Sequence, residues 1–170
     1  MQKIGLATCS KLPQLTDEDQ LLLNSLGQAG VSAQPVVWDD REVNWQEFPC
    51  IVIRSCWDYH TRLDEFLNWL ELLEKQNVSI LNPADIIRWN CNKRYLLDLE
   101  EKDILIVPTV FLQRNSSANL QQLLKNRGWQ QAVIKPTVAA TAYQTWLTSF
   151  DNPESDQSNL KKCSQNFRKL

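Results

Sequence analysis

Several features that would place this chain in a well-marked functional class are missing from its 170 residues. Lys and Arg together (18) nearly balance Asp and Glu (20), so no basic excess predicts binding to nucleic acid or to an anionic membrane. No apolar run approaches the ~18 residues of a membrane-spanning helix, and the first residues lack a signal-peptide pattern. We therefore expect a soluble, cytoplasmic protein with no nucleic-acid partner and no membrane partner.

The cysteines and the single histidine also lack a recognisable pattern. The five cysteines are odd in number, widely spaced and form no C-x-x-C pair, which argues against a disulfide framework and a zinc ribbon. His60 has no acidic or cysteine residue at a metal-ligand spacing, so we interpret it as a loop residue. Cys56 has no base beside it that would make it a nucleophile. We predict no metal ligands and assign no catalytic residue.

The composition that remains is that of an ordinary globular protein, with 43% hydrophobic and 22% charged residues. Apolar, β-branched runs predict strands at 3–8, 32–38, 50–56 and 79–81. Helical patterns follow the first and third of these strands. This alternation predicts an α/β fold whose mostly parallel sheet is flanked by helices.

Helix-start signals precede both helices. Thr16 is the expected cap of the first, and the three carboxylates after it, Asp17, Glu18 and Asp19, complement the positive end of the helix dipole. Thr61 is the expected cap of the second, with Asp64 three residues later as in a capping box.

A second segment begins near Pro83. Its residue pattern predicts helices at 90–102 and 118–127 and strands at 107–112, 131–135 and 143–149. A polar tail follows. We therefore divide the chain into three parts, which are an N-terminal α/β domain at 1–83, a partial second lobe at 84–150 and a polar tail at 151–170.

Two stretches of the sequence resemble one family. The first is RSCWDY at 54–59, and the second is RWNCNKRYLL at 88–97, followed by VPT at 107–109. Together they resemble ATP-grasp ligases similar to glutathione synthetase, and most nearly the cyclo-ligase of cycloserine biosynthesis. The resemblance extends over 3–148. It implies a domain of the type that precedes the ATP-grasp fold, followed by an incomplete ATP-grasp small lobe.

In such ligases ATP converts a carboxylate into an acyl-phosphate, and an amine then displaces the phosphate. The resemblance implies that Lys93 and Lys135 contact the nucleotide, that Arg54 binds a substrate carboxylate and that Asp58 orients an amine. ATP is the implied cofactor, with Mg in full-length relatives, and a small carboxylate or amino acid is the implied substrate. Residue by residue, other interpretations stay open: solvated lysines, a local Arg54–Asp58 ion pair, or Asp58 as a helix cap.

The sequence departs from the family in two respects. The stretch 137–142 after the strand lysine contains no glycine, which weakens the prediction of a phosphate-covering loop. The large, metal-binding lobe of the family would follow Leu170, and Asp151, Glu154 and Asp156 have no strand framework to bring them together. We therefore expect a truncated relative that is inactive alone and whose exposed lobe favours self-association or a partner chain. The alternative is a non-catalytic module that binds a nucleotide or small molecule, or an interaction domain.

Overall fold

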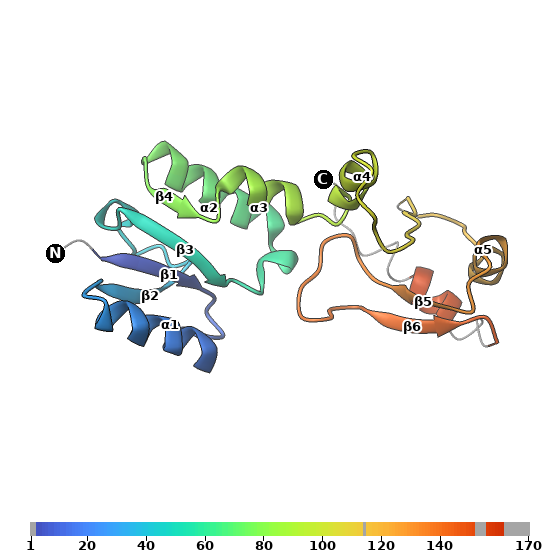
Figure 1. Ribbon diagram of the computed structural model, residues 1–170, viewed down its shortest axis with the longest axis horizontal. Coiled ribbons are helices and arrows are strands. Elements are labelled where there is room, and N and C mark those ends of the chain that lie inside the picture. Colours follow the sequence, from blue (N-terminus) through green and yellow to red (C-terminus); the bar gives the residue numbers. More distant parts are fainter. Residues whose placement is uncertain (1–2, 114, 152–155, 162–170) are drawn as a thin grey trace. The chain divides into compact units, whose positions relative to one another are not determined.

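The computed structural model describes residues 3–113, 115–151 and 156–161, and the chain divides into two compact units between Cys91 and Asn92 (Figure 1). The elements of the first unit are β1 (Ile4–Thr8), α1 (Asp17–Gln28), β2 (Ala33–Val37), η1 (Trp45–Glu47), β3 (Cys50–Ser55), η2 (Tyr59–Thr61), α2 (Leu63–Lys75), β4 (Ser79–Leu81) and α3 (Ala84–Asn90). Those of the second unit are α4 (Tyr95–Glu100), α5 (Leu120–Arg127), β5 (Gln131–Ile134) and β6 (Trp146–Ser149), with a further helical stretch at 156–161.

The first unit is built on a four-stranded parallel sheet of order β2-β1-β3-β4. Helix α1 covers one face, and α2 and α3 cover the other (Figure 1). The chain passes from β1 outward to β2 and then returns to β3 on the opposite side of β1. These features confirm the predicted α/β class with a parallel sheet and flanking helices.

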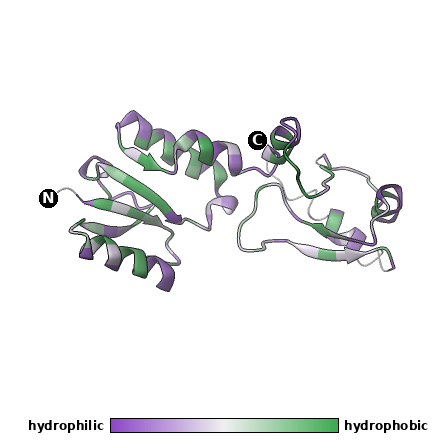
Figure 2. Ribbon diagram, viewed as in Figure 1, coloured by the Kyte–Doolittle hydropathy of each residue, from purple (hydrophilic) through white to green (hydrophobic). Residues whose placement is uncertain are grey.

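An aromatic cluster fills the space between the sheet and α2. Trp38 lies 5.4 Å from Phe66 and 6.0 Å from Trp69, measured between ring centroids. Leu70 and Leu73 of α2 are fully buried beside them. Edge-to-face and tilted ring contacts of this kind add to the free energy gained by burying the apolar surface. Figure 2 shows β3 as hydrophobic along most of its length and hydrophilic at its carboxyl end.

The start of α1 agrees with its sequence signal, whereas the start of α2 does not. Thr16 caps α1 by accepting a hydrogen bond from the Asp19 backbone N–H at 3.2 Å. The prediction of Thr61 as the cap of α2 is wrong, because Arg62 occupies the N-cap position and makes no side-chain capping bond. Thr61 belongs to η2, where its hydroxyl donates to the Asp58 carbonyl at 2.9 Å.

The second unit contains a two-stranded antiparallel sheet, β5–β6, covered on one face by α5. Its core consists of Leu120, Leu124 and Leu160, with Ala132 and Ile134 of β5 among the half-buried residues packed against it. Gly128 ends α5 in the left-handed conformation at φ 64°. None of the helices in the described ranges is long and apolar enough to cross a membrane.

Two predicted elements of the second segment are corrected by the structure. The helix expected at 90–102 is interrupted: α3 ends at Asn90 and α4 begins at Tyr95. Between them the backbone N–H of Lys93 donates to the Thr137 carbonyl at 2.7 Å, and the Asn92 side chain accepts from the Arg94 N–H. These bonds replace helical ones. The expected strand at 107–112 has no strand assignment, and Val107 is 80% exposed.

The last predicted strand is shorter than expected. It begins at Trp146 instead of Tyr143, because 141–144 form a turn in which the Tyr143 N–H donates to the Ala140 carbonyl. The first compact unit extends beyond Pro83 to Cys91, because Ala84, Ile87 and Cys91 are buried and the first two join the core against α2.

Candidate functional site

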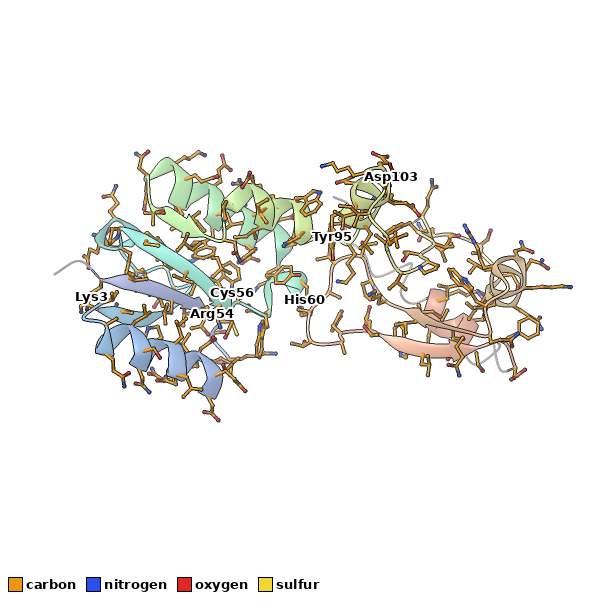
Figure 3. All side chains as sticks on the ribbon, viewed as in Figure 1. Lys3, Arg54, Cys56, His60, Tyr95 and Asp103 are labelled. Carbon is orange, nitrogen blue, oxygen red and sulfur yellow. The ribbon has the colours of Figure 1, made fainter. Side chains whose placement is uncertain are left out.

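The carboxyl ends of β1 and β3 form the first candidate site. The chain leaves the sheet in opposite directions on the two sides of these strands, and open α/β sheets bind their ligands at such a point. Arg54 lies near the carboxyl end of β3, with Cys56 directly after the strand (Figure 3). The topology therefore places the RSCWDY run of the sequence at this edge of the sheet.

Arg54 is held by a buried carboxylate from α1. Its Nε and Nη2 atoms each lie 2.7 Å from Oδ1 of Asp19, and the Ser55 hydroxyl donates to Oδ2 of the same carboxylate. The Asp19 side chain is 5% exposed, whereas that of Arg54 is 40% exposed. The alternative of a local ion pair between Arg54 and Asp58, left open by the sequence, is therefore wrong, since the acidic partner of Arg54 is Asp19.

Asp58 belongs to a second charged cluster at the ends of β2 and β3. Its Oδ1 accepts from the Trp38 indole N–H at 2.9 Å, and its Oδ2 lies 2.7 Å from Nη2 of Arg62. Nη1 of Arg62 lies 2.6 Å from Asp39, and the guanidinium lies 4.7 Å from the centroid of the Trp38 ring. Asp58 occupies the N-cap position of η2 but makes no side-chain capping bond, so the alternative that its side chain caps a helix is not supported.

The electrostatics of this cluster stabilise the charged form of Arg62. Burial lowers its pKa, but hydrogen bonds and charge attraction from Asp39 and Asp58 outweigh that effect, so the pKa is raised. Oδ1 of Asp39 is buried with no hydrogen-bond partner among the described residues. Asp58 would need its remaining lone pairs to contact an amine, because both of its oxygens already accept hydrogen bonds.

Cys56 and His60 lie close to this edge without forming a catalytic pair (Figure 3). Burial raises the pKa of the Cys56 thiol well above its usual value, and the negative charge of Asp58 adds to the shift. The thiolate is therefore disfavoured. A ring nitrogen of His60 lies 2.8 Å from the Trp57 carbonyl oxygen.

Lys93 and Lys135 form the second candidate site, which lies within the second unit. Lys93 is half-buried, and its Nζ donates to the Ala139 carbonyl at 2.9 Å. Burial lowers the pKa of Lys93, and the positive charge of Lys135 lowers it further. The two ammonium groups are thus close enough to repel each other, and neither forms an ion pair within the described part of the chain. Paired cations without a carboxylate partner are suited to an anion.

Lys135 is exposed beside an open apolar face of the β5–β6 sheet. Val133 and Leu147 are register partners on that face and are 56% and 66% exposed. Alternate residues of a strand share a face, so Lys135, two positions after Val133, continues the same side. The opposite face packs against the α5 cluster. The second unit thus presents a cationic group and an apolar surface together.

The loop after Lys135 reaches left-handed geometry without glycine. Thr141, Ala142 and Gln144 have φ values of 51°, 56° and 47°. The glycine-poor sequence argued against such turns, because a Cβ atom makes them costly. Lys93 holds the beginning of this loop through the carbonyls of Thr137 and Ala139. Sequence reasoning missed both this role of Lys93 and the ion pair of Asp19, which it treated only as a dipole-complementing residue.

No group of three or more His, Cys, Asp or Glu residues that could hold a metal ion occurs in the described ranges. Of the acidic residues noted in the polar tail, Glu154 lies outside the described residues. A shallow depression of about 330 Å³ lies beside α5 and is lined by residues that include Val110, Gln122 and Asn126.

Comparisons with known proteins agree with the α/β fold. Residues 4–82 match the family described as "D-cycloserine synthetase DcsG, N-terminal domain". The chain is 31% identical over 119 residues to the cycloserine biosynthesis protein DcsG of Streptomyces lavendulae, a match that covers 68% of this chain and 40% of that protein. The crystal structure of D-cycloserine synthetase DcsG is similar with a TM-score of 0.83 and 26% identity, over 95% of this chain and 55% of that chain.

A D-alanyl-alanine synthetase A from Vibrio cholerae shares the fold with a TM-score of 0.63 and 13% identity, over 96% of this chain and 57% of that one. The architecture is thus that of an α/β protein similar in fold to these ligases. More particularly, the chain is similar in sequence and structure to D-cycloserine synthetase. It spans about half the length of the solved relatives that it matches.

Proposed function

We propose that this chain binds ATP and a small carboxylate as part of an ATP-dependent carboxylate–amine ligase of the ATP-grasp type that works through an acyl-phosphate. The sequence relation to D-cycloserine synthetase supports the ligase class. The nucleotide assignment rests on the pair Lys93 and Lys135. Lys93 bonds to the Thr137 and Ala139 carbonyls of the loop that directly follows Lys135, and neither lysine has an acidic partner among the described residues.

Phosphates are the anions that such a pair fits best. Lys is a compact point charge with several donors, and one bond to the Ala139 carbonyl leaves Lys93 with two more. The exposed side chains of Val133 and Leu147 offer an apolar surface beside Lys135 for the rest of the nucleotide. In the first unit, Arg54 supplies the contact for a substrate carboxylate, for which a guanidinium is geometrically suited.

Mg is implied by the family, and it neutralises phosphate charge when bound. The described residues offer no acidic cluster for it, so we derive no step through it. Because the chain spans 55% of the length of the solved D-cycloserine synthetase, we expect no ligation from the chain alone.

Thermal unfolding with and without Mg-ADP tests the nucleotide site. Binding to the folded state stabilises it, by about 2.7 kcal/mol at one hundred times Kd. We expect a saturable rise in Tm for the wild type that is lost in Lys135→Ala. The matched control is Lys125→Ala, which removes an exposed lysine of α5 and should keep the full rise. Equal responses of the two variants would contradict the site.

Phosphate release tests the expected inactivity of the chain alone. With ATP, Mg and D-alanine, the chain alone should release no phosphate above the background of Lys135→Ala. Turnover that depends on Lys135 would show a complete active site and overturn the expected inactivity. Stabilisation by ADP without turnover fits both the ligase part and the non-catalytic nucleotide-binding alternative.

A further inference from the structure

The most buried residue of α1 is a carboxylate. Asp19 is 4% exposed, while Leu21 is 67% exposed and Leu22 and Leu23 are only half-buried. Removing an ionised carboxylate from water costs several kcal/mol unless it is paired and hydrogen-bonded. The helix therefore places a charge, instead of a leucine, at its most enclosed position on the sheet.

The surroundings of Asp19 satisfy that charge from two directions. Oδ1 is shared by Nε and Nη2 of Arg54, and Oδ2 accepts from the Ser55 hydroxyl. Ser55 is the register partner of Thr8, and both side chains are fully buried. Asp19 and Ser55 are thus hydrogen-bonded to each other, and Thr8, whose hydroxyl donates to the Leu12 carbonyl, pairs with Ser55 in the sheet.

This arrangement fixes one side of the Arg54 guanidinium and leaves the other side free. Nε and Nη2 are bonded to Asp19, whereas Nη1 has no hydrogen bond to the part of the chain that the structure describes. Held at two nitrogens, the planar group loses most of its rotational freedom before any ligand arrives. The side chain is 40% exposed at the sheet edge where ligands bind in such folds.

We propose that Asp19 is a positioning residue that holds the Arg54 guanidinium so that its free edge faces the carboxylate of a small amino-acid substrate. The proposal rests on the proposed function of Arg54, and it adds the residue that prepares Arg54 for binding. Asp17 and Glu18, in the same turn, are exposed and complement the helix dipole without touching Arg54. They therefore provide matched controls.

The first test observes Arg54 without a ligand. A guanidinium bonded through Nε should show a resolved Nε–H signal in ¹⁵N NMR that exchanges slowly with water. We expect Asp19→Asn to lose that protection and Glu18→Gln, which removes the same charge from the same turn, to retain it. Retained protection in Asp19→Asn would overturn the proposal.

The second test measures binding of D-alanine, a small amino-acid probe, by calorimetry. Asp19→Asn should weaken binding about tenfold, as expected for the loss of one charge-assisted positioning contact. Glu18→Gln should bind as the wild type does. The double variant Asp19→Asn/Arg54→Ala should bind no more weakly than Arg54→Ala, since the effect passes through Arg54. If Asp19→Asn instead weakens binding as much in Arg54→Ala as it does in the wild type, the effect does not pass through Arg54, and Asp19 has only a structural role.

Arg54→Lys covers the case in which Asp19→Asn fails to fold. The lysine keeps a positive charge beside Asp19. With a single side-chain nitrogen, however, it cannot bond Asp19 through two nitrogens and offer a third to the substrate. Wild-type affinity in Arg54→Lys would contradict the proposal, and an affinity about tenfold weaker than that of the wild type would support it. If the wild type does not bind D-alanine, the proposed carboxylate site is contradicted, while the NMR comparison still decides whether Asp19 fixes Arg54.

Discussion

In the first unit, Arg54 and Arg62 each bind carboxylates that are largely buried, whereas in the second unit Lys93 and Lys135 lie near each other with no carboxylate partner among the described residues. Paired charges are fixed in place before a ligand arrives. Neighbouring like charges are stabilised only when an anion binds between or beside them. We therefore propose that the first unit orients a substrate and that the second unit binds phosphates.

The cores of the two units also differ, because the core of the first unit is much larger than that of the second. The first unit buries a large aromatic and aliphatic cluster between its sheet and α2, while the second buries three leucines beneath a two-stranded sheet. Leu105 and Val107 of the second unit are 99% and 80% exposed. A two-stranded sheet with one bare face needs additional contacts to be stable. The second unit should therefore depend more on what it binds than the first does.

Core truncation should give the largest difference between the units. Leu70 and Leu124 are both fully buried, but Leu70 lies in the larger cluster. We expect Leu70→Ala to cost about 4 kcal/mol and Leu124→Ala about 2 kcal/mol, because a small cluster collapses more readily around a cavity. Leu72→Ala, at a 40% exposed position of α2, should change the free energy of unfolding far less than either. Urea unfolding measures the free energy of unfolding of all three variants. Equal losses for Leu70→Ala and Leu124→Ala would contradict the expected difference between the two cores.

Gly5 tests how tightly the first sheet is packed. A Cβ atom there would lie 2.5 Å from Cδ1 of Ile51 and 3.1 Å from Cγ2 of Val36. We expect Gly5→Ala to destabilise the protein by about 2 kcal/mol through overpacking, since the Ile51 side chain can shift only in part. Gly27→Ala is the control, because no atom lies within 4 Å of its Cβ position, and alanine is the better helix former. A neutral Gly5→Ala would show that the sheet has room to relax.

The two units also differ in how far the sequence predicts them. In the first unit the strands and α1 follow from apolar runs and the Thr16 cap, because burial between helices imposes the pattern directly. In the second unit the predicted helix at 90–102 is interrupted by the Lys93 and Asn92 bonds. The Lys93 bond reaches residue 137, and such a long-range contact leaves no local signal in the sequence.

The candidate sites show the same limit. The order of strands could be expected to bring Arg54 to the sheet edge, but its acidic partner, 35 residues earlier on α1, could not be read from spacing. In the sequence Asp19 is one of three similar carboxylates in the first turn of α1. Only the packing of α1 on the sheet shows which of them contacts Arg54. Likewise, the absence of glycine from 137–142 argued against left-handed backbone in that stretch, although Thr141 and Ala142 both adopt it.

The pKa of Lys93 allows the second unit to be tested directly. Burial and the charge of Lys135 lower it in the folded state, so the protonated form is disfavoured on folding. Below that lowered pKa, Lys93 therefore reduces stability, and the penalty is relieved as the pH rises through it towards the unfolded value. We expect an NMR titration to show a lowered Lys93 pKa that rises in Lys135→Gln and stays lowered in Lys125→Gln. An unchanged pKa in Lys135→Gln would mean that burial alone is responsible and that the two lysines do not interact.

The glycine-free loop should give the smallest effect. Ala142 has φ 56°, where an L-residue costs roughly 1–2 kcal/mol, while glycine costs about 0.5–1 kcal/mol in chain entropy. We therefore expect Ala142→Gly to stabilise the protein by about 0.5 kcal/mol in urea unfolding. Ala139→Gly, at a loop position without positive φ, should be neutral or destabilising. A loss of stability in Ala142→Gly would mean that contacts of the Ala142 methyl group outweigh the backbone strain, and the loop would then be rigid through packing, as the first unit is.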